Sequence, residues 1–262
     1  MDPSVIVMEG IRKTYVEKGK KTYALDDFSL SIAKGSFVTL MGASGCGKST
    51  VTKIIAGIED FDAGRLFVDN LEIRHGKMPL EIRKRIGYVF QLHNLAEWRT
   101  VEGNLYFPLE MYAEKKSSLW EQRATRYLDF VGLTRYRNVY PRELSGGMKQ
   151  RVGIARALMT EPDMLILDQP FGALDAITRS MISAKLYKMV RDEQKTVLMV
   201  TSDIDEAACY SDIIHIMDHG RIKQSITSSV PTEHRLRDEF RHSAEYLDIK
   251  LQLTKAIYND LK

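Results

Sequence analysis

Apolar residues near the start of the chain are spaced as in β-strands. Val5–Met8 is a short apolar run, and Phe28–Ile32 alternates apolar and polar residues with period two, as a half-buried strand does. Ser36–Met41 is almost continuously apolar and β-prone, which fits a strand buried on both faces, as in a parallel sheet. After a glycine-rich segment, Ser49–Ile58 has apolar residues at helical spacing. This order predicts strands followed by the first helix of an α/β domain.

The middle of the chain changes to helical spacing. Ser118–Glu121 has the pattern of a capping box, which marks the start of a helix, and a second helix is expected from Ser145 to just before Pro162. The apolar positions of these two helices are Ala124, Leu128 and Val131 in the first and Met148, Val152, Ala155 and Met159 in the second. The pattern predicts an all-helical insert over residues 92–160.

Strand-like runs return after the insert. Met164–Asp168, Thr196–Thr201 and Ile213–Met217 are apolar and β-prone, and helical patterns separate them. Because strands alternate with helices, we expect a mostly parallel sheet. From Arg221 onward the chain is mostly polar, and we expect it to be helical. The packing positions expected in this tail are Leu247, Leu251 and Ile257.

Composition and charge exclude several classes of protein. The net charge of +3 is the small difference between 38 basic and 35 acidic side chains, so we expect no nucleic-acid partner. The N-terminus has no basic region before its apolar run, and no 18 apolar residues occur together. Two cysteines do not suggest a disulfide framework. We therefore expect a cytoplasmic protein whose membrane role, if it has one, depends on a partner.

A phosphate-binding loop follows the buried strand. Gly42-x-x-x-x-Gly47-Lys48-Ser49 matches the P-loop pattern, in which glycines turn backbone N–H groups toward a phosphate and the next helix adds its positive end. Lys48 is expected to reach the β- and γ-phosphates, and the Ser49 hydroxyl to ligate Mg²⁺. The residues expected to bind the nucleotide here are Gly42, Ala43, Ser44, Gly45, Cys46, Gly47, Lys48, Ser49 and Thr50.

The run Met164–Asp168 supplies a second element of a nucleotide site. An apolar strand that ends in a carboxylate can place Asp168 beside the Mg²⁺ coordination shell. Together with the phosphate loop, it predicts a nucleoside triphosphatase that uses ATP and Mg²⁺, but it leaves open which kind.

A third motif identifies a family. Leu144–Arg151 reads Leu-Ser-Gly-Gly-Met-Lys-Gln-Arg, so that Ser145, Gly146 and Gly147 begin a helix with exposed backbone N–H groups and a hydroxyl. The chain here resembles the ATP-binding-cassette family, whose signature is this Leu-Ser-Gly-Gly stretch. The resemblance implies that the signature of one subunit closes over the nucleotide held by the phosphate loop of another.

The resemblance also implies a fold and a domain division. The fold is α/β, a P-loop NTPase core with a mostly parallel sheet, an N-terminal antiparallel β-subdomain and an all-helical insert. The implied domains are the ATP-binding core with the β-subdomain (1–91 and 161–225), the helical signature subdomain (92–160) and a C-terminal helical tail (226–262).

Other motif positions take their roles from the resemblance. Tyr15 resembles the aromatic residue that stacks on adenine, and Gln91 the glutamine that contacts Mg²⁺ and the attacking water. Ala173-Leu-Asp175 resembles the loop that passes between subunits of the closed dimer, so Asp175 joins the nucleotide-binding set. The implied metal ligands are Ser49, Gln91 and Asp168. The implied catalytic set is Lys48, Gln91 and the residues at positions 169 and 202.

Two positions depart from the family pattern. Gln169 stands where the family has the glutamate that acts as general base, and an amide cannot accept the proton. Ser202 stands where the family has a histidine that contacts the γ-phosphate. Losing a positioned base costs about 10²- to 10⁴-fold in rate, so we expect slow or absent hydrolysis. Three origins stay open: a deliberate Glu-to-Gln change, which the intact surroundings favour, a degenerate natural subunit paired with an active one, or a slow natural ATPase.

The longer pattern resembles the subgroup that energises uptake of nitrate, sulfonates and taurine. The matching residues are Trp98–Val101, Phe171–Ala176 and Glu239–Phe240. The resemblance implies two ATP-binding subunits, either copies or paralogues, at the cytoplasmic face of the membrane. They are expected to lie beneath transmembrane permease subunits. An extracytoplasmic solute-binding protein delivers the solute to these permease subunits. Residues His93 to Tyr112 are expected to contribute to the groove for a permease helix.

Alternatives exist inside and outside this class. Inside it, an export or lipid-trafficking cassette is also built with separate permease chains. Outside it, cassette proteins of DNA repair or translation share the signature but carry long arms or a second cassette, which this chain does not show. A P-loop kinase would require Leu144–Arg151 to be accidental.

Overall fold

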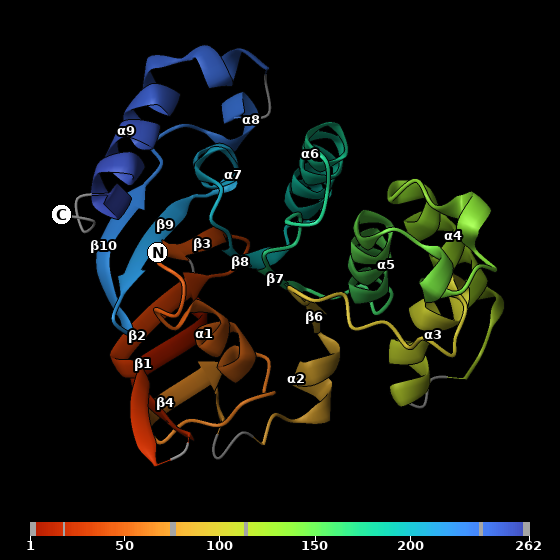
Figure 1. Cartoon of the computed structure of the whole chain (residues 1–262), viewed down its shortest axis with the longest axis horizontal. Coiled ribbons are helices and arrows are strands. Elements are labelled where there is room, and N and C mark those ends of the chain that lie inside the picture. The colour runs from red at the N-terminus through yellow and green to blue at the C-terminus, as the bar shows by residue number, and fades with distance from the viewer. Residues whose placement is uncertain (1–3, 18, 74–76, 113–114, 236–237, 259–262) are drawn as a thin grey trace. The chain divides into compact units, whose positions relative to one another are not determined.

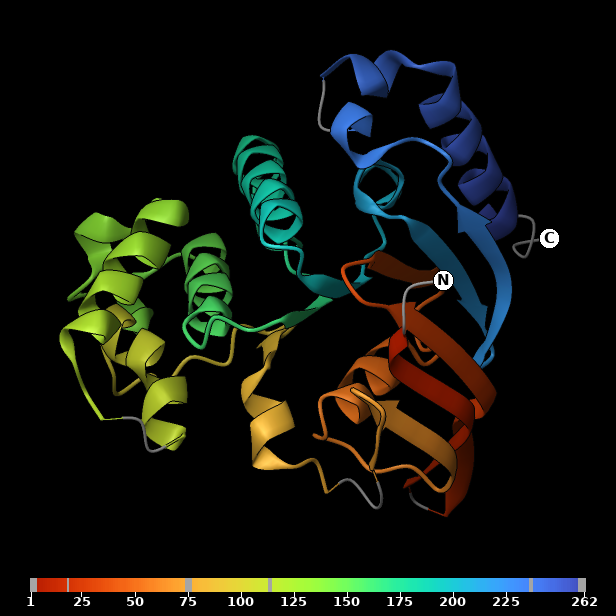
Figure 2. The same cartoon turned by 180° about the vertical axis from the view of Figure 1, so that it is seen from behind.

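A computed structural model describes residues 4–17, 19–73, 77–112, 115–235 and 238–258 of the chain. The fold divides into two compact units, one of residues 1–83 and 194–262 and the other of residues 84–193. Figures 1 and 2 show them from opposite sides, and each unit is described by itself below.

The first unit begins with an antiparallel sheet whose strand order is β2-β1-β4-β5. Its strands are β1 (Ser4–Glu17), β2 (Lys20–Ala33), β4 (Ala63–Val68) and β5 (Leu71–Ile73). In β2 the side chains alternate as predicted: Phe28, Leu30 and Ile32 are buried, whereas the two intervening serines are exposed. The predicted antiparallel β-subdomain is therefore confirmed.

A mainly parallel sheet forms the centre of the first unit, in the order β10-β9-β3-β8. Its strands are β3 (Phe37–Gly42), β8 (Thr196–Val200), β9 (Ile213–Asp218) and β10 (Arg221–Thr227). β3 pairs in parallel with both β8 and β9. The helices here are α1 (Lys48–Ile55) and α7 (Ile204–Tyr210). β3 and β8 are buried along almost their whole length, on both faces, as their apolar runs predicted.

The second unit combines a parallel strand pair with helices. The pair is β6 (Ile86–Val89) and β7 (Met164–Asp168), and the junction between the units falls within α2 (Leu80–Lys84). The longer helices are α3 (Val101–Met111), α4 (Ser118–Phe130), α5 (Gly146–Leu158) and α6 (Ala176–Asp192). The single-turn 3₁₀ helices are η1 (Thr134–Tyr136) and η2 (Pro141–Glu143). Between residues 92 and 160 the described elements are helical, as predicted.

Two predicted helix boundaries are wrong. The helix expected to continue to Ile58 ends at Ile55, because Gly57 adopts a left-handed conformation with φ of 65° and Ile58 is 52% exposed. The helix predicted to be capped by Ser118 begins at Ser118 itself, and its N-cap residue Ser117 makes no side-chain cap hydrogen bond. Neighbouring serines offer the same capping chemistry, so the sequence alone did not fix the starting residue.

The tail differs most from the prediction. Its first element, β10, is a strand that pairs antiparallel with β9, where we expected helix. Next come α8 (Thr232–Arg235), the 3₁₀ helix η3 (Asp238–His242) and α9 (Ala244–Tyr258), drawn in blue in Figure 1. Leu247 and Leu251 are 59% and 51% exposed, so they are not packing positions. The buried residues of α9 are Tyr246, Ile249 and Leu253.

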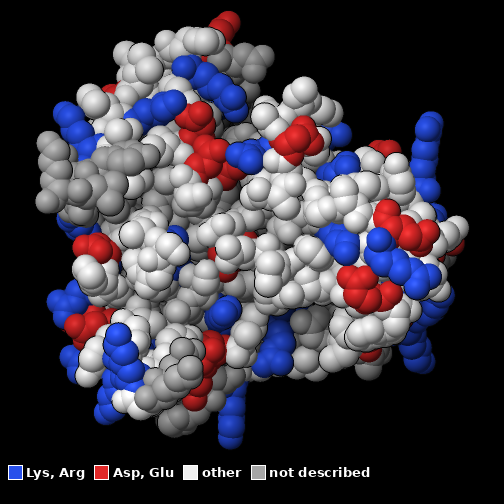
Figure 3. All heavy atoms as spheres, in the orientation of Figure 1, with Lys and Arg blue, Asp and Glu red and all other residues white. Residues whose placement is uncertain are grey.

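Surface charges of both signs are interspersed on the face shown in Figure 3. In the second unit, Arg123 pairs with Glu161 at 2.5 Å, and Arg126 with Glu193 at 2.7 Å. Such exposed pairs stabilise a fold by about 1 kcal/mol at most. None of the described helices has the length and apolar character needed to cross a membrane.

The corrected face of α9 gives a stability prediction. Replacing the fully buried Leu253 by Ala should lower the free energy of unfolding by about 2–5 kcal/mol, because it removes packed methyl groups and leaves a cavity. Leu251→Ala, on the exposed side of the same helix, should change it by less than about 0.5 kcal/mol. Urea unfolding followed by circular dichroism measures both; equal losses would show that the buried face is misassigned.

Candidate functional site: two halves of a nucleotide-binding cassette

The phosphate loop (residues 42–50) joins β3 to α1 in the first unit. Gly42, Gly45 and Gly47 have positive φ angles of 143°, 81° and 105°. A Cβ atom on Gly42 would lie 2.2 Å from the Met217 carbonyl oxygen, and one on Gly47 2.3 Å from that of Ala24. Because no other residue fits at these approaches, the glycines hold the loop tightly against β2 and β9.

The turn after β9 also holds this loop. The Gly220 backbone N–H donates to the Cys46 carbonyl oxygen at 3.1 Å, and the Asp26 N–H donates to the Gly220 carbonyl at 3.3 Å. The Arg221 guanidinium lies 2.5 Å from the Asp26 carboxylate. This contact was not predicted from the sequence, although a glycine after Asp218-His219 is a recognisable turn signal.

Lys48 lies over the phosphate loop at the start of α1. Its side chain is buried, and its Nζ donates to the carbonyl oxygens of Gly42 at 2.8 Å and Ala43 at 2.7 Å. The first turn of α1 has no acidic residue, and its N-cap, Gly47, has no side chain to cap it. A helix start of this kind offers its N–H groups and positive dipole to an anion, as the P-loop prediction requires.

Tyr15 and Ser202 belong to the same unit as the phosphate loop. Tyr15 is half-buried on β1 opposite Thr22, and the Lys13 ammonium lies 5.1 Å from the centre of its ring. Ser202 is exposed in the turn between β8 and α7. The roles expected for Tyr15 and Ser202 stay predictions.

The second unit contains the predicted glutamines. Gln91 follows β6, Gln169 follows β7, and the Gln91 Nε2 donates to the Gln169 Oε1 at 3.3 Å. Gln169 has a φ of 47°, a left-handed conformation that is uncommon outside glycine. Asp168 ends β7 and is 3% exposed. The fold thus brings together two residues that are 78 positions apart and that the resemblance had assigned to one reaction.

Two buried amides hold the segment around Gln91. Gln150 of α5 is 1% exposed and its Nε2 donates to the Phe90 carbonyl oxygen at 3.2 Å. Asn104 of α3 is fully buried, donates to the Ala96 carbonyl and accepts the Ala96 N–H at 2.8 Å. Neither residue was predicted from the sequence to belong to the site. Polar side chains inside helices with apolar faces were the available signal.

The Leu-Ser-Gly-Gly motif begins α5 as predicted. Ser145 is the N-cap, and its Oγ accepts the Met148 N–H at 3.3 Å. A Cβ atom on Gly146 would meet no atom within 4 Å, whereas one on Gly147 would lie 3.0 Å from the Ala173 carbonyl oxygen. One glycine therefore leaves an open surface at the helix start, and the next permits close packing.

The loop before α6 lies beside this motif. Asp175 is the N-cap of α6, and its Oδ1 accepts the Thr178 N–H at 3.0 Å. That backbone hydrogen bond lowers the pKa of the exposed Asp175 carboxyl. The Ala173–Asp175 loop and the signature glycines are thus assembled on one unit.

The predicted metal ligands come from both units. Ser49 belongs to the first, and Gln91 and Asp168 belong to the second. Hydroxyl, amide and carboxylate oxygens are hard donors that suit Mg²⁺. Among the described residues there is no group of three or more His, Cys, Asp or Glu side chains that could hold a metal. The chemistry of these three donors suits Mg²⁺, and their role as a metal site stays a prediction.

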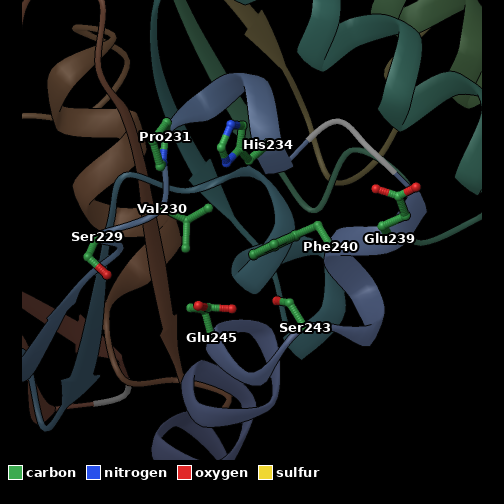
Figure 4. A pocket seen from close by; sticks show the side chains of 8 residues that line it. All are labelled: Ser229, Val230, Pro231, His234, Glu239, Phe240, Ser243 and Glu245. Atoms are coloured by element: carbon green, nitrogen blue, oxygen red, sulfur yellow. The ribbon is translucent and has the colours of Figure 1, made fainter.

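A cavity of about 330 Å³ lies in the tail of the first unit. Figure 4 shows the Phe240 side chain among its lining residues, which also include Pro231, His234 and Glu245. No residue of the phosphate loop lines this cavity.

Comparison with known proteins agrees with this geometry. The sequence pattern of the family described as ABC transporter matches residues 25–172. The chain belongs to the ABC transporter family. The predicted family resemblance and the ATPase class are thereby confirmed.

Two relatives and two solved structures illustrate the match. An aliphatic sulfonates import ATP-binding protein of Bacillus subtilis is 43% identical over 195 residues, 74% of this chain and 72% of its own. A methionine import ATP-binding protein of Rhodopseudomonas palustris is 40% identical over 224 residues, 84% of this chain and 60% of its own. A dimeric bacterial ABC transporter cassette superposes with a TM-score of 0.79 at 34% identity, covering 85% of this chain and 98% of its own. Its post-hydrolysis state, which holds ADP and Pi, matches with the same TM-score.

The signature glycines give a matched pair of variants. Alanine favours a helix over glycine at both positions, but only at Gly147 would the new methyl group meet a backbone carbonyl. Gly147→Ala should therefore be less stable than Gly146→Ala by about 1–2 kcal/mol. Differential scanning calorimetry of the two variants measures the difference; equal unfolding temperatures would contradict the packing described for Gly147.

Proposed function

We propose that this chain is the ATP-binding subunit of a membrane importer, in which ATP drives closure of two such subunits and hydrolysis resets them. The observation that carries the proposal is the presence, in one chain, of two helix starts that can present backbone N–H groups to a phosphate. The glycine loop with Lys48 is one, and the open start of α5 at Ser145 and Gly146 is the other. A chain with both surfaces suits a composite site shared with a second subunit.

Each half of the proposed site has a separate task. The backbone of Gly42–Thr50 binds the phosphates, Lys48 contacts the β- and γ-phosphates, and Tyr15 stacks on the adenine. Ser145, Gly146, Gly147 and Asp175 act on the nucleotide held by the opposing subunit. Support comes from the exposed helix start and from the position of the Ala173–Asp175 loop beside it.

Ser49, Gln91 and Asp168 are proposed to hold Mg²⁺. The ion would neutralise charge on the phosphate oxygens when bound. Of the chain's own residues, Gln91 also orients the attacking water, since its amide already lies within hydrogen-bond distance of position 169.

Hydrolysis by this chain is proposed to be slow. Gln169 accepts a hydrogen bond from Gln91 at 3.3 Å, so its amide has the reach of a glutamate, but it cannot take a proton from water. Ser202 is shorter than histidine and carries no positive charge. The groups of the phosphate loop are thus present, whereas Gln169 cannot act as a base and Ser202 offers the γ-phosphate only a short, uncharged hydroxyl.

The transported solute is proposed to be a small molecule of the nitrate, sulfonate or taurine type. The relative at 43% identity is named for aliphatic sulfonates, which supports this class. The proposed partners are transmembrane permease subunits, a second copy or paralogue of this chain and, indirectly, an extracytoplasmic binding protein. The chain would then lie peripherally on the cytoplasmic face of the membrane. We also propose the predicted division into an ATP-binding core, a helical signature subdomain and a C-terminal tail.

Restoring a carboxylate at position 169 tests the catalytic assignment. Gln169→Glu should raise ATP turnover at least tenfold, and up to about 10⁴-fold, because a general base is regained. Gln122→Glu, an identical change at an exposed position of α4, is the control and should leave turnover unchanged. Phosphate release by the assembled transporter measures both. An unchanged rate in Gln169→Glu would overturn the assignment of position 169 as the base.

The permease partner gives a separate test. Trp98 is 78% exposed in the segment expected to meet a permease helix, so burying its indole should contribute strongly to binding. Trp98→Asp should weaken co-purification of a polytopic membrane protein from solubilised membranes by about 30-fold. Ile58→Asp, at a 52% exposed position outside that segment, should not. If both variants retain the membrane protein equally, the expected groove is wrong.

A further inference from the structure

The turn that carries Ser202 is fixed on its inner side by a short hydrogen-bond network. Thr201 is buried, its hydroxyl donates to Glu206 at 2.6 Å, and it accepts the Asp203 N–H at 3.0 Å. Asp203 caps α7 by accepting the N–H groups of Asp205 at 2.8 Å and Glu206 at 3.2 Å. Ser202 is therefore joined rigidly to the first turn of α7, and a displacement of that turn would displace Ser202.

The tail helix α9 holds the same turn from outside through Asp205. The Tyr246 hydroxyl donates to Asp205 Oδ1 at 2.7 Å, and the Lys250 ammonium lies 2.6 Å from the same oxygen. Tyr246 is 5% exposed, and the Lys250 ammonium lies 5.2 Å from the centre of its ring. Burial alone would raise the pKa of the Asp205 carboxyl, but the contacts with Lys250 and Tyr246 outweigh it and lower that pKa. Both donors thus favour the ionised carboxylate.

The tail is itself anchored, so it can serve as a support. Arg235 of α8 is buried, donates to the Ser211 carbonyl oxygen at the end of α7, and pairs with Asp212 at 2.5 Å. Phe240, which lines the cavity in Figure 4, packs edge-on against Tyr246 with ring centres 5.6 Å apart. α7 is therefore held by the tail near both ends, at Asp205 and at Ser211.

We propose that Tyr246 and Lys250 are positioning residues for the ATPase: by holding Asp205 they fix the first turn of α7 and so set where Ser202 meets the γ-phosphate. The inference rests on the proposed function, in which the Ser202 hydroxyl makes the γ-phosphate contact that the family resemblance assigns to position 202. The family pattern matches residues 25–172, and α9 lies outside them. The side chains that hold Asp205 therefore come from a part of the chain that the family pattern does not cover.

Paired measurements of ATP and ADP affinity test this inference, because ADP lacks the γ-phosphate. Tyr246→Phe and Lys250→Met each remove one donor to Asp205 while keeping most of the side-chain volume. Each should weaken ATP binding by about three- to tenfold and leave ADP binding unchanged. Amide hydrogen exchange over residues 202–206 should become faster. A purely structural role would weaken both nucleotides alike. The controls are Tyr23→Phe on β2 and Lys255→Met on α9, both exposed.

Ser202→Ala separates failure of this inference from failure of the role given to Ser202. If Ser202→Ala lowers the ATP-to-ADP affinity ratio and Lys250→Met adds nothing in that background, the tail acts through Ser202. If Ser202→Ala lowers the ratio but neither tail variant changes the ratio or the exchange, the inference is overturned. If Ser202→Ala leaves the ratio unchanged, Ser202 does not contact the γ-phosphate, and the part of the inference that acts through Ser202 is wrong. Amide exchange then tests whether the tail fixes α7. Faster exchange over residues 202–206 in Tyr246→Phe supports that contact, and unchanged exchange overturns it.

Discussion

The close approach between Gly42 and the Met217 carbonyl determines where the phosphate loop leaves the sheet. Gly42 is the last residue of β3 and pairs with Met217 of β9, and its missing side chain lets two parallel strands converge there. Gly47 makes a similar approach to Ala24 of β2, so the loop is fixed at both of its ends. The carbonyl groups that bind Lys48 and the N–H groups at the start of α1 owe their directions to these two contacts. Rigid backbone donors of this kind bind phosphate without first being ordered.

The second unit achieves similar order by different means. Its predicted site residues lie at helix starts and strand ends: Ser145 and Asp175 cap helices, while Gln91 and Gln169 follow adjacent strands. Side-chain caps and buried amides, rather than close backbone approaches, hold these segments in place. Local hydrogen bonds at these helix starts and strand ends therefore decide where these side chains lie.

Prediction from sequence succeeded where the physical signal was local. The run Met164–Asp168 is a strand with the predicted ends because every residue in it is buried. The phosphate loop and the Ser145 cap depend on glycine and hydroxyl chemistry within a few residues, so both could be located from sequence. β10 was missed because Arg221–Thr227 is mostly polar and exposed, and only its pairing with β9 makes it a strand.

Prediction failed where two apolar stripes compete. α9 has one stripe through Leu247 and Leu251 and another through Tyr246, Ile249 and Leu253, and only tertiary packing selects the second. The contact between Gln91 and Gln169 could not be predicted from residue spacing either, because it depends on the pairing of β6 with β7. The hydrogen bond from Tyr246 to Asp205 could not be predicted for the same reason. The two residues are 41 positions apart, and only the fold brings them together.

The turn at Gly220 sets a lower limit on the fragment of this chain that can fold with its phosphate loop intact. The Gly220 N–H donates to the Cys46 carbonyl, and Arg221 pairs with Asp26 of β2. β10 begins at Arg221 and is followed by α8. A fragment that ended with the sheet residues of β9 would contain every motif of the nucleotide site and still lack the backbone donor that closes the loop. The boundary of the functional domain therefore lies beyond its last recognisable motif.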